Sequence, residues 1–158
     1  RGLMPYKGYG ITAGRAPMED WAKKTGETRG MNWLVTSASG QRGMRRVVVD
    51  TNFWKTFVAA RCSTAKGTAG ALWVYGDREE QHRLLADQLA AEGCQKTFGN
   101  GREVWEWHVI PNADNHLFDC VVMSAVAASI SNVSLDKLRT EQKPVRRLKL
   151  SELQASKR

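Results

Sequence analysis

The segment RRVVVD, residues 45–50, constrains the fold more than any other part of the sequence. Its three consecutive valines are β-branched, and such a run suits a strand that is buried on both faces of a sheet. Residues 50–67 follow at once, with Asp50 available as a helix cap, apolar residues at three- and four-residue spacing, and Gly67 as a stop. A buried strand that leads directly into a helix predicts the α/β class.

Two short strands are expected ahead of this unit. Residues 3–8 predict a strand that ends at Gly8, and residues 31–35 predict another. The Gly- and Thr-rich stretch 9–30 between them is expected to be a long loop or an irregular excursion. The turn at 37–43 leads to the valine strand, and the sequence leaves open whether a hairpin forms there.

The strand–helix pattern is repeated in residues 71–93. Residues 71–75 predict a strand, and Asp77 followed three residues later by Glu80 is the capping-box signature of a helix start. Gly93 is expected to end that helix. The α/β pattern therefore extends to a second unit.

Residues 94–110 predict a β-hairpin. The segments CQKTF and EVWEWHVI flank GNGR, and Trp105, Trp107 and Val109 alternate with polar residues as in a strand with one buried face. A helix capped by Asp114 is expected next, and its small residues allow close packing on a sheet. Most of the six tryptophans are expected to pack in the core and not to stack on bases.

The chain has 24 basic and 16 acidic residues, so its formal net charge is +8. This charge favours a polyanionic partner such as nucleic acid. Residues 136–158 hold eight basic and three acidic residues, and we expect a flexible basic tail, or alternatively a docking segment, behind a single domain at residues 1–135. No apolar run reaches the roughly 20 residues of a membrane span, so no membrane partner is expected.

Asp119 is the strongest candidate for a chemical role. It lies one turn inside an otherwise apolar helix, where a carboxylate costs free energy unless it is paired or bound to a metal ion. Its side chain points back toward the helix start, where loops converge. An ion pair with His116 or with a nearby basic residue explains the same position equally well.

Asp50 is a second candidate, because ligands of α/β proteins bind beyond the carboxyl ends of strands, although capping of the next helix explains it as well. His116 and Asn115 are candidates to support Asp119, with a surface or capping role as the alternative for His116. Several basic residues are candidates for contacts with DNA phosphates if their side chains converge: Lys7, Lys55, Arg61, Arg42, Arg45 and Arg46.

The signatures of several enzyme classes are missing from these 158 residues. There is no Walker A loop, GxGxxG, nucleophile elbow or HExxH, so nucleotide hydrolysis, dinucleotide binding, serine-hydrolase and zinc-protease chemistry lack support. The three cysteines include no CxxC pair, so neither a zinc site nor a disulfide framework is indicated.

Three segments together resemble the C-terminal part of the large terminase subunit of lambda-like tailed phages: VVVDTNFWKTFVAARC, HRLLADQLAAEG and VWEWHVIPNADNHLFDCVVMSAVAAS. The resemblance runs from about residue 5 to residue 130, and NHLFDC and DTNFWK are its most specific elements. It implies the latter part of an RNase H-like nuclease domain, with a mixed sheet flanked by helices, which we expect to be incomplete at its N-terminus.

The resemblance also implies an activity. The family's nuclease cuts concatemeric double-stranded DNA with a carboxylate cluster and divalent metal, here Mg²⁺ or Mn²⁺ in a two-metal site, and Asp119 matches the last acid of that cluster. The first two acids are expected upstream of Arg1, so this chain alone is expected to bind metal weakly and to cleave poorly.

The partners implied are double-stranded DNA, the small terminase subunit and the portal, in the cytoplasm of the bacterial host. Two other functions stay open: a non-catalytic DNA- or portal-binding module, and an inactive prophage remnant.

Overall fold

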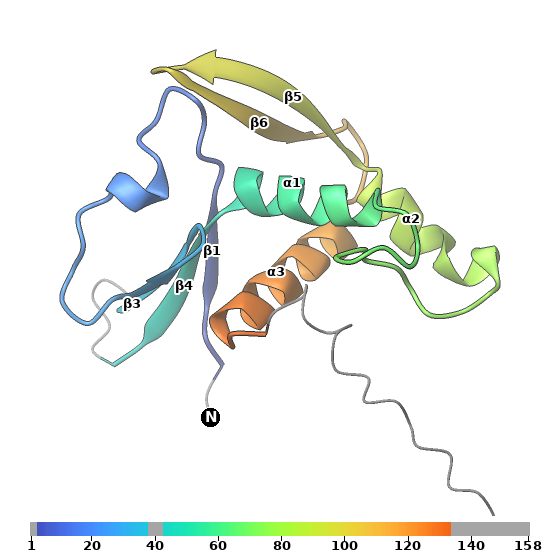
Figure 1. The fold of residues 1–158 in the computed structure, drawn as a ribbon, viewed down its shortest axis with the longest axis horizontal. Coiled ribbons are helices and arrows are strands. Elements are labelled where there is room, and N and C mark those ends of the chain that lie inside the picture. Colours follow the sequence, from blue (N-terminus) through green and yellow to red (C-terminus); the bar gives the residue numbers. More distant parts are fainter. Residues whose placement is uncertain (1–2, 38–42, 134–158) are drawn as a thin grey trace, which may run out of the picture.

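The computed structural model describes residues 3–37 and 43–133. Its main sheet has the strand order β1-β4-β3-β2, formed by β1 (Tyr6–Tyr9), β2 (Thr28–Gly30), β3 (Trp33–Ser37) and β4 (Arg45–Asp50). β1 runs parallel to β4, whereas β3 is antiparallel to both β4 and β2. The sheet is therefore mixed, as expected, and β3 and β4 pair as a hairpin does (Figure 1).

β4 is buried from both sides of the sheet. Val47 and Val49 face the larger core, which the helices complete, whereas Val48 packs on the opposite face with Ile11 and Met18. Neighbouring side chains of a strand point to opposite faces, so three adjacent valines fill both cores at once. The prediction of a strand buried on both faces is confirmed.

Residues 10–27 cover the second face of the sheet. They are irregular apart from the short 3-10 helix η1 (Met18–Asp20), as the sequence predicted. β2, at the end of the expected loop, was not predicted. It pairs with β3 across a turn in which Asn32 has a φ of 51°, a left-handed value that asparagine adopts more readily than most residues.

Two helices cover the first face. α1 (Thr51–Cys62) begins directly after β4, and α3 (His116–Ile130) packs against α1 (Figure 1). Trp33 of the sheet donates from Nε1 to Ser129 Oγ of α3 at 3.0 Å. Both helices bury apolar residues at four-residue spacing: Trp54 and Val58 in α1, and Phe118, Val122 and Val126 in α3.

The strand predicted at residues 71–75 is wrong. These residues have no regular structure, and Tyr75 is 95% exposed. A β-branched and aromatic run becomes a strand only where a sheet edge satisfies its backbone groups. Here the backbone N–H of Leu72 donates instead to the carbonyl of Arg61, at the end of α1 (3.0 Å).

The helix start predicted at Asp77 is also wrong. The 3-10 helix η2 (Glu79–His82) comes first, and α2 (Arg83–Leu89) follows with His82 as its N-cap. No residue of η2 is buried, so packing does not reinforce the local capping signature. α2 ends at Leu89, well before Gly93, because the next strand begins at Glu92.

The predicted hairpin is present as β5 (Glu92–Gly99) and β6 (Arg102–Val109), which lie beside α1 (Figure 1). Asn100 and Gly101 have φ values of 48° and 71°, as a two-residue type I′ turn requires. Trp107 packs against the larger core, but Trp105 and Val109 are exposed, so the expectation of one buried face holds only for part of the hairpin.

Of the tryptophans predicted to pack, Trp33 and Trp54 are buried, whereas Trp73 is exposed like Trp105. None of the helices within the described ranges is both long and apolar enough to cross a membrane. The predicted tail at 136–158 and Arg42 lie outside the described residues.

Candidate functional site

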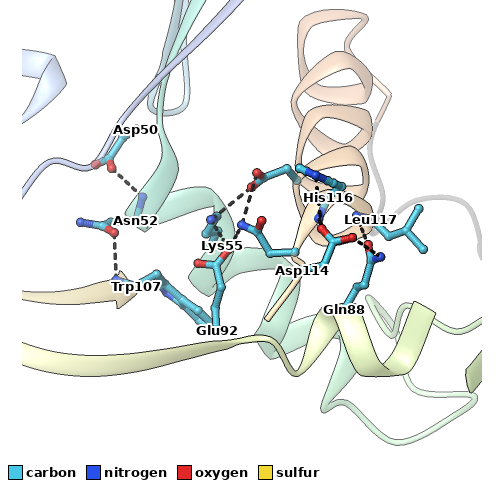
Figure 2. A network of polar contacts seen from close by, with 11 residues as sticks. Asp50, Asn52, Lys55, Gln88, Glu92, Trp107, Asp114, His116 and Leu117 are labelled. Carbon is cyan, nitrogen blue, oxygen red and sulfur yellow. Dashed lines mark hydrogen bonds and ion pairs between the residues drawn. The ribbon is translucent and has the colours of Figure 1, made fainter. Parts of the chain in front are cut away.

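Lys55 of α1 lies between two carboxylates. Its Nζ is 3.1 Å from Asp119 Oδ1 of α3 and forms a short ion pair with Glu92 Oε1, at the start of β5 (Figure 2). The same Nζ lies 5.5 Å from the centre of the Phe118 ring. Lys55 is buried because its face of α1 packs against α3, and the two carboxylates neutralise its charge in these surroundings.

Asn115 completes the arrangement. Its Nδ2 donates to Glu92 Oε1 at 2.6 Å and to Asp119 Oδ2 at 3.4 Å. Lys55, Glu92, Asn115 and Asp119 therefore form a closed polar ring, to which α1, β5 and the start of α3 contribute. Side-chain exposure falls from 45% for Asp119 to 11% for Lys55 and 1% for Glu92, so the ring runs from solvent into the core.

The start of α3 is fixed from two sides. The N-cap residue is Asn115 and not Asp114 as predicted, and the Asn115 side chain makes no capping hydrogen bond. Asp114 Oδ1 instead accepts the backbone N–H of His116 at 3.3 Å. Gln88 of α2 donates to Asp114 Oδ2 at 3.1 Å and accepts the N–H of Leu117 at 2.7 Å (Figure 2). These contacts place Asp119 in the first turn of α3.

Asp119 is thus paired with a basic residue, one of the two alternatives that its spacing allowed. The partner is Lys55 and not His116, whose Nε2 lies 3.3 Å from Asp114 Oδ1. The His116 side chain is 84% exposed. Of the two predicted supporting residues, the structure brings Asn115 to Asp119 and directs His116 toward Asp114.

The negative charge of Asp119 also affects the ionisation of Tyr6 in the sheet. The pKa of Tyr6 in β1 is raised from 10.0 to about 12, first by burial of the phenol and second by the negative charge of Asp119. Tyr6 therefore keeps its phenol proton well above neutral pH, and Asp119 lies close enough to disfavour the phenolate.

Asp50 caps α1, as one of its two interpretations predicted. Its Oδ1 accepts the backbone N–H groups of Asn52 at 3.0 Å and Phe53 at 3.3 Å, and burial raises its pKa while these hydrogen bonds oppose the shift. Asn52 in turn accepts the backbone N–H of Trp107 at 3.1 Å (Figure 2). These contacts attach the hairpin to α1, and the catalytic role of Asp50 stays a prediction.

The predicted DNA-contacting residues have different neighbours. Lys7 lies over the Tyr9 ring, Arg45 donates to Thr28 Oγ1 at 3.5 Å, and the Arg61 guanidinium lies 3.3 Å from the centre of a ring on its own helix. Lys55 is buried in the polar ring. These contacts do not bring the basic side chains together on one surface, so their role in DNA binding stays a prediction.

Glu92 was not singled out from the sequence. In the pattern AAEG it looked like the last turn of a helix that Gly93 would stop, whereas it is the first residue of β5. Its importance comes from a partner 37 positions away, Lys55, and no local pattern signals such a contact.

The described residues do not by themselves form a site for a divalent cation, because both oxygens of Asp119 already face Lys55 and Asn115. Within residues 3–37 and 43–133, no group of three or more His, Cys, Asp or Glu side chains could hold a metal ion. Glu92 is buried against Lys55 and Asn115, which leaves Asp119 as the accessible carboxylate of the ring. A two-metal centre would need further ligands from elsewhere.

The fold and the site define an α/β domain with a mixed sheet and an accessible acid at the start of a helix. Over residues 2–142 the chain matches the family model described as terminase large subunit gpA, endonuclease domain, and it belongs to that family. The resemblance found in the sequence is thereby confirmed. Comparison with curated proteins and with solved structures gives no match.

Removal of one or both charges of the Lys55–Glu92 ion pair tests how much the ring contributes to stability. Lys55→Met leaves the buried Glu92 without its cation and should lower the free energy of unfolding by about 3–5 kcal/mol, whereas Lys55→Met/Glu92→Leu should regain most of this loss. Urea unfolding monitored by circular dichroism measures both. The exposed pair Lys96–Glu103 is the control, and Lys96→Met should cost at most about 1 kcal/mol. A double variant as unstable as Lys55→Met would contradict the interpretation.

Substitutions of Asp50 separate capping from catalysis. Asp50→Asn keeps an oxygen that accepts the α1 N–H groups and removes a buried charge, so stability should be close to that of the wild type, whereas Asp50→Ala should cost about 1–2 kcal/mol. Thermal unfolding checks this order. If Asp50→Asn folds normally but abolishes DNA cleavage in an active polypeptide, the carboxylate itself takes part in catalysis.

The raised pKa of Tyr6 predicts a pH-dependent stability. Between pH 10 and about 12 the unfolded chain loses the phenol proton that the folded chain keeps, so the unfolded state binds fewer protons and the free energy of unfolding falls as pH rises. Tyr6→Phe should lose less stability across this window, as measured by urea unfolding at its two ends. Equal slopes for the two proteins would show that the phenol is not protected.

Proposed function

We propose that this chain is part of a metal-dependent endonuclease that cuts concatemeric double-stranded DNA during phage packaging, by two-metal phosphodiester hydrolysis. The observation that carries the proposal is the position of Asp119. In a chain of the terminase endonuclease family, it is the accessible acid of a ring whose other members are more deeply buried or neutral.

The chemistry of the site supports this role. Two-metal hydrolysis needs carboxylates that hold two ions about 3.5–4 Å apart. Mg²⁺ and Mn²⁺ prefer oxygen ligands, and Asp119 offers a carboxylate whose side chain is 45% exposed. The remaining ligands would come from outside the described residues, so we expect the 158-residue chain alone to bind Mn²⁺ weakly and to cleave poorly.

The partners in this proposal are double-stranded DNA, the small terminase subunit and the portal, in the host cytoplasm. The net charge of +8 suits DNA, whose backbone attracts basic proteins without regard to sequence. The residues proposed to contact phosphates are Lys7, Lys55, Arg45 and Arg61, with Arg42 as a further candidate.

A non-catalytic DNA- or portal-binding module is the second candidate. The Lys55–Asp119 ion pair favours it, because a paired carboxylate needs no metal to explain its position. Binding would then depend steeply on salt concentration and would be unchanged in Asp119→Asn. An inactive remnant would show neither cleavage nor strong binding.

Cleavage of supercoiled plasmid tests the proposed function. A polypeptide extended upstream of Arg1 should cut the plasmid in Mg²⁺ or Mn²⁺, and Asp119→Asn should reduce the rate by more than the roughly 10–100-fold typical of residues that only support a ligand. Asp87→Asn is the matched control, because it removes one exposed carboxylate from α2 and should cut at the normal rate.

Equal cutting by wild type and a folded Asp119→Asn variant would remove Asp119 from the site. No cutting by either protein would favour the binding module. Strong cutting by the 158-residue chain itself, lost in Asp119→Asn, would show that the described residues make a more complete site than we expect.

A further inference from the structure

The geometry points to Asn100, at the tip of the β5–β6 hairpin, as a site of spontaneous deamidation that loosens the hairpin from the loop of residues 12–14. The reagent is water, and the product is an aspartate or isoaspartate in place of a neutral amide. The inference is independent of the proposed function, because it involves neither Asp119 nor a bound ion.

Asn100 has the neighbour that favours this reaction. It is followed by Gly101, and the two form the only Asn-Gly pair in the sequence. They are the central residues of the turn, and the strand register joins Gly99 to Arg102 on either side of them. The backbone nitrogen of Gly101 therefore lies outside the ladder of paired strands, and no side chain on Gly101 hinders its approach to a neighbouring carbonyl carbon.

The turn is open to water. Asn100 is exposed, and a Cβ placed on Gly101 would meet no heavy atom within 4 Å. Deamidation needs a side chain that can rotate toward the backbone and a water molecule that can reach the product. The surroundings of the turn allow both, and the hydrogen bond from Asn100 Nδ2 to the Gly14 carbonyl is the described polar contact that has to break first.

The reaction proceeds in two balanced steps. The backbone nitrogen of Gly101 forms a bond to Asn100 Cγ, the bond from Cγ to Nδ2 breaks, and Nδ2 leaves as ammonia with the proton of the Gly101 N–H. Water then opens the cyclic imide at either carbonyl carbon, where its hydroxyl group completes a carboxylic acid while its remaining proton returns to the nitrogen. Opening at one carbon gives aspartate, and opening at the other gives isoaspartate, whose main chain is longer by one carbon atom. Both acids are ionised at neutral pH.

The product changes a contact that holds the hairpin in place. The tip of the hairpin lies against residues 12–14, where Asn100 Nδ2 donates to the Gly14 carbonyl at 3.0 Å (Figure 1). Arg102 Nη2 donates to the Thr12 carbonyl beside it, also at 3.0 Å. A carboxylate at position 100 has no proton to donate, so its oxygens would face the Gly14 carbonyl oxygen. Aspartate thus replaces an attraction by a repulsion, and isoaspartate also lengthens a turn that sets the strand register.

Peptide mapping of the chain by mass spectrometry, after incubation in mildly alkaline buffer, tests the modification. Alkaline conditions favour loss of the Gly101 N–H proton, so Asn100 should be converted before any other asparagine of the chain. Isoelectric focusing should show a species that has gained one negative charge. Asn100→Gly is the matched control: a Gly-Gly pair suits the same turn and has no amide to lose, so this variant should give no such species.

Hydrogen exchange of the Ala13 backbone N–H tests the loosening of the hairpin, because this group donates to Glu106 Oε1 of β6 at 3.3 Å. Asn100→Asp has the charge of the direct product, and aspartate tolerates a left-handed φ, so the turn should still form. Exchange should be fastest in Asn100→Asp and slowest in the wild type. Asn100→Gly should lie between them, since it lacks both the hydrogen bond and the repulsion.

Each half of the inference has its own contrary result. Conversion of another asparagine first would overturn the modification site, as would conversion of Asn100 in the urea-unfolded chain but not in the folded chain. Equal exchange of the Ala13 N–H in the wild type and Asn100→Asp would overturn the loosening. The proposed function stands or falls separately, in the cleavage assay with Asp119→Asn.

Discussion

The buried ion pair between Lys55 and Glu92 is the interaction on which the geometry of the site depends. Removing two charges from water is costly, and their attraction offsets that cost only if the contact is close and the remaining groups are hydrogen-bonded. Asn115 and Asp119 meet the second condition. Since the four residues come from α1, β5 and α3, the pair is fully satisfied only when all three elements are in place.

The direct connection between β4 and α1 fixes the position of Lys55 relative to the sheet. No loop separates them, because Asp50 is both the last residue of the strand and the cap of the helix. The buried strand therefore determines where α1 starts, and Lys55 follows in the second turn. Asn52 then fixes the hairpin by accepting the N–H of Trp107, and Glu92 lies at the other strand of that hairpin. The core and the polar ring are thus positioned by the same few residues.

The elements that the sequence predicted correctly are those with a strong local pattern: the valine strand, α1, the Asn-Gly hairpin and α3. The errors concern elements whose outcome depends on something other than a strong local pattern. Residues 71–75 have the composition of a strand but no sheet edge beside them, and β2 is too short to show a pattern. In the site, Asp119 was conspicuous as a charge in an apolar helix, whereas Glu92 was not, because its partner Lys55 is 37 positions away in the sequence.

The surroundings of Lys55 show how a basic chain can contain a locally acidic group of residues. The Lys55 side chain is 11% exposed, so a DNA phosphate would have to compete with Glu92 and Asp119 for its ammonium group. A chain with a net charge of +8 can still present a locally acidic end at Asp119, because salt at physiological concentration screens exposed charges beyond about 8 Å. The net positive charge of the chain and the two carboxylates around Lys55 are thus compatible, because they act over different distances.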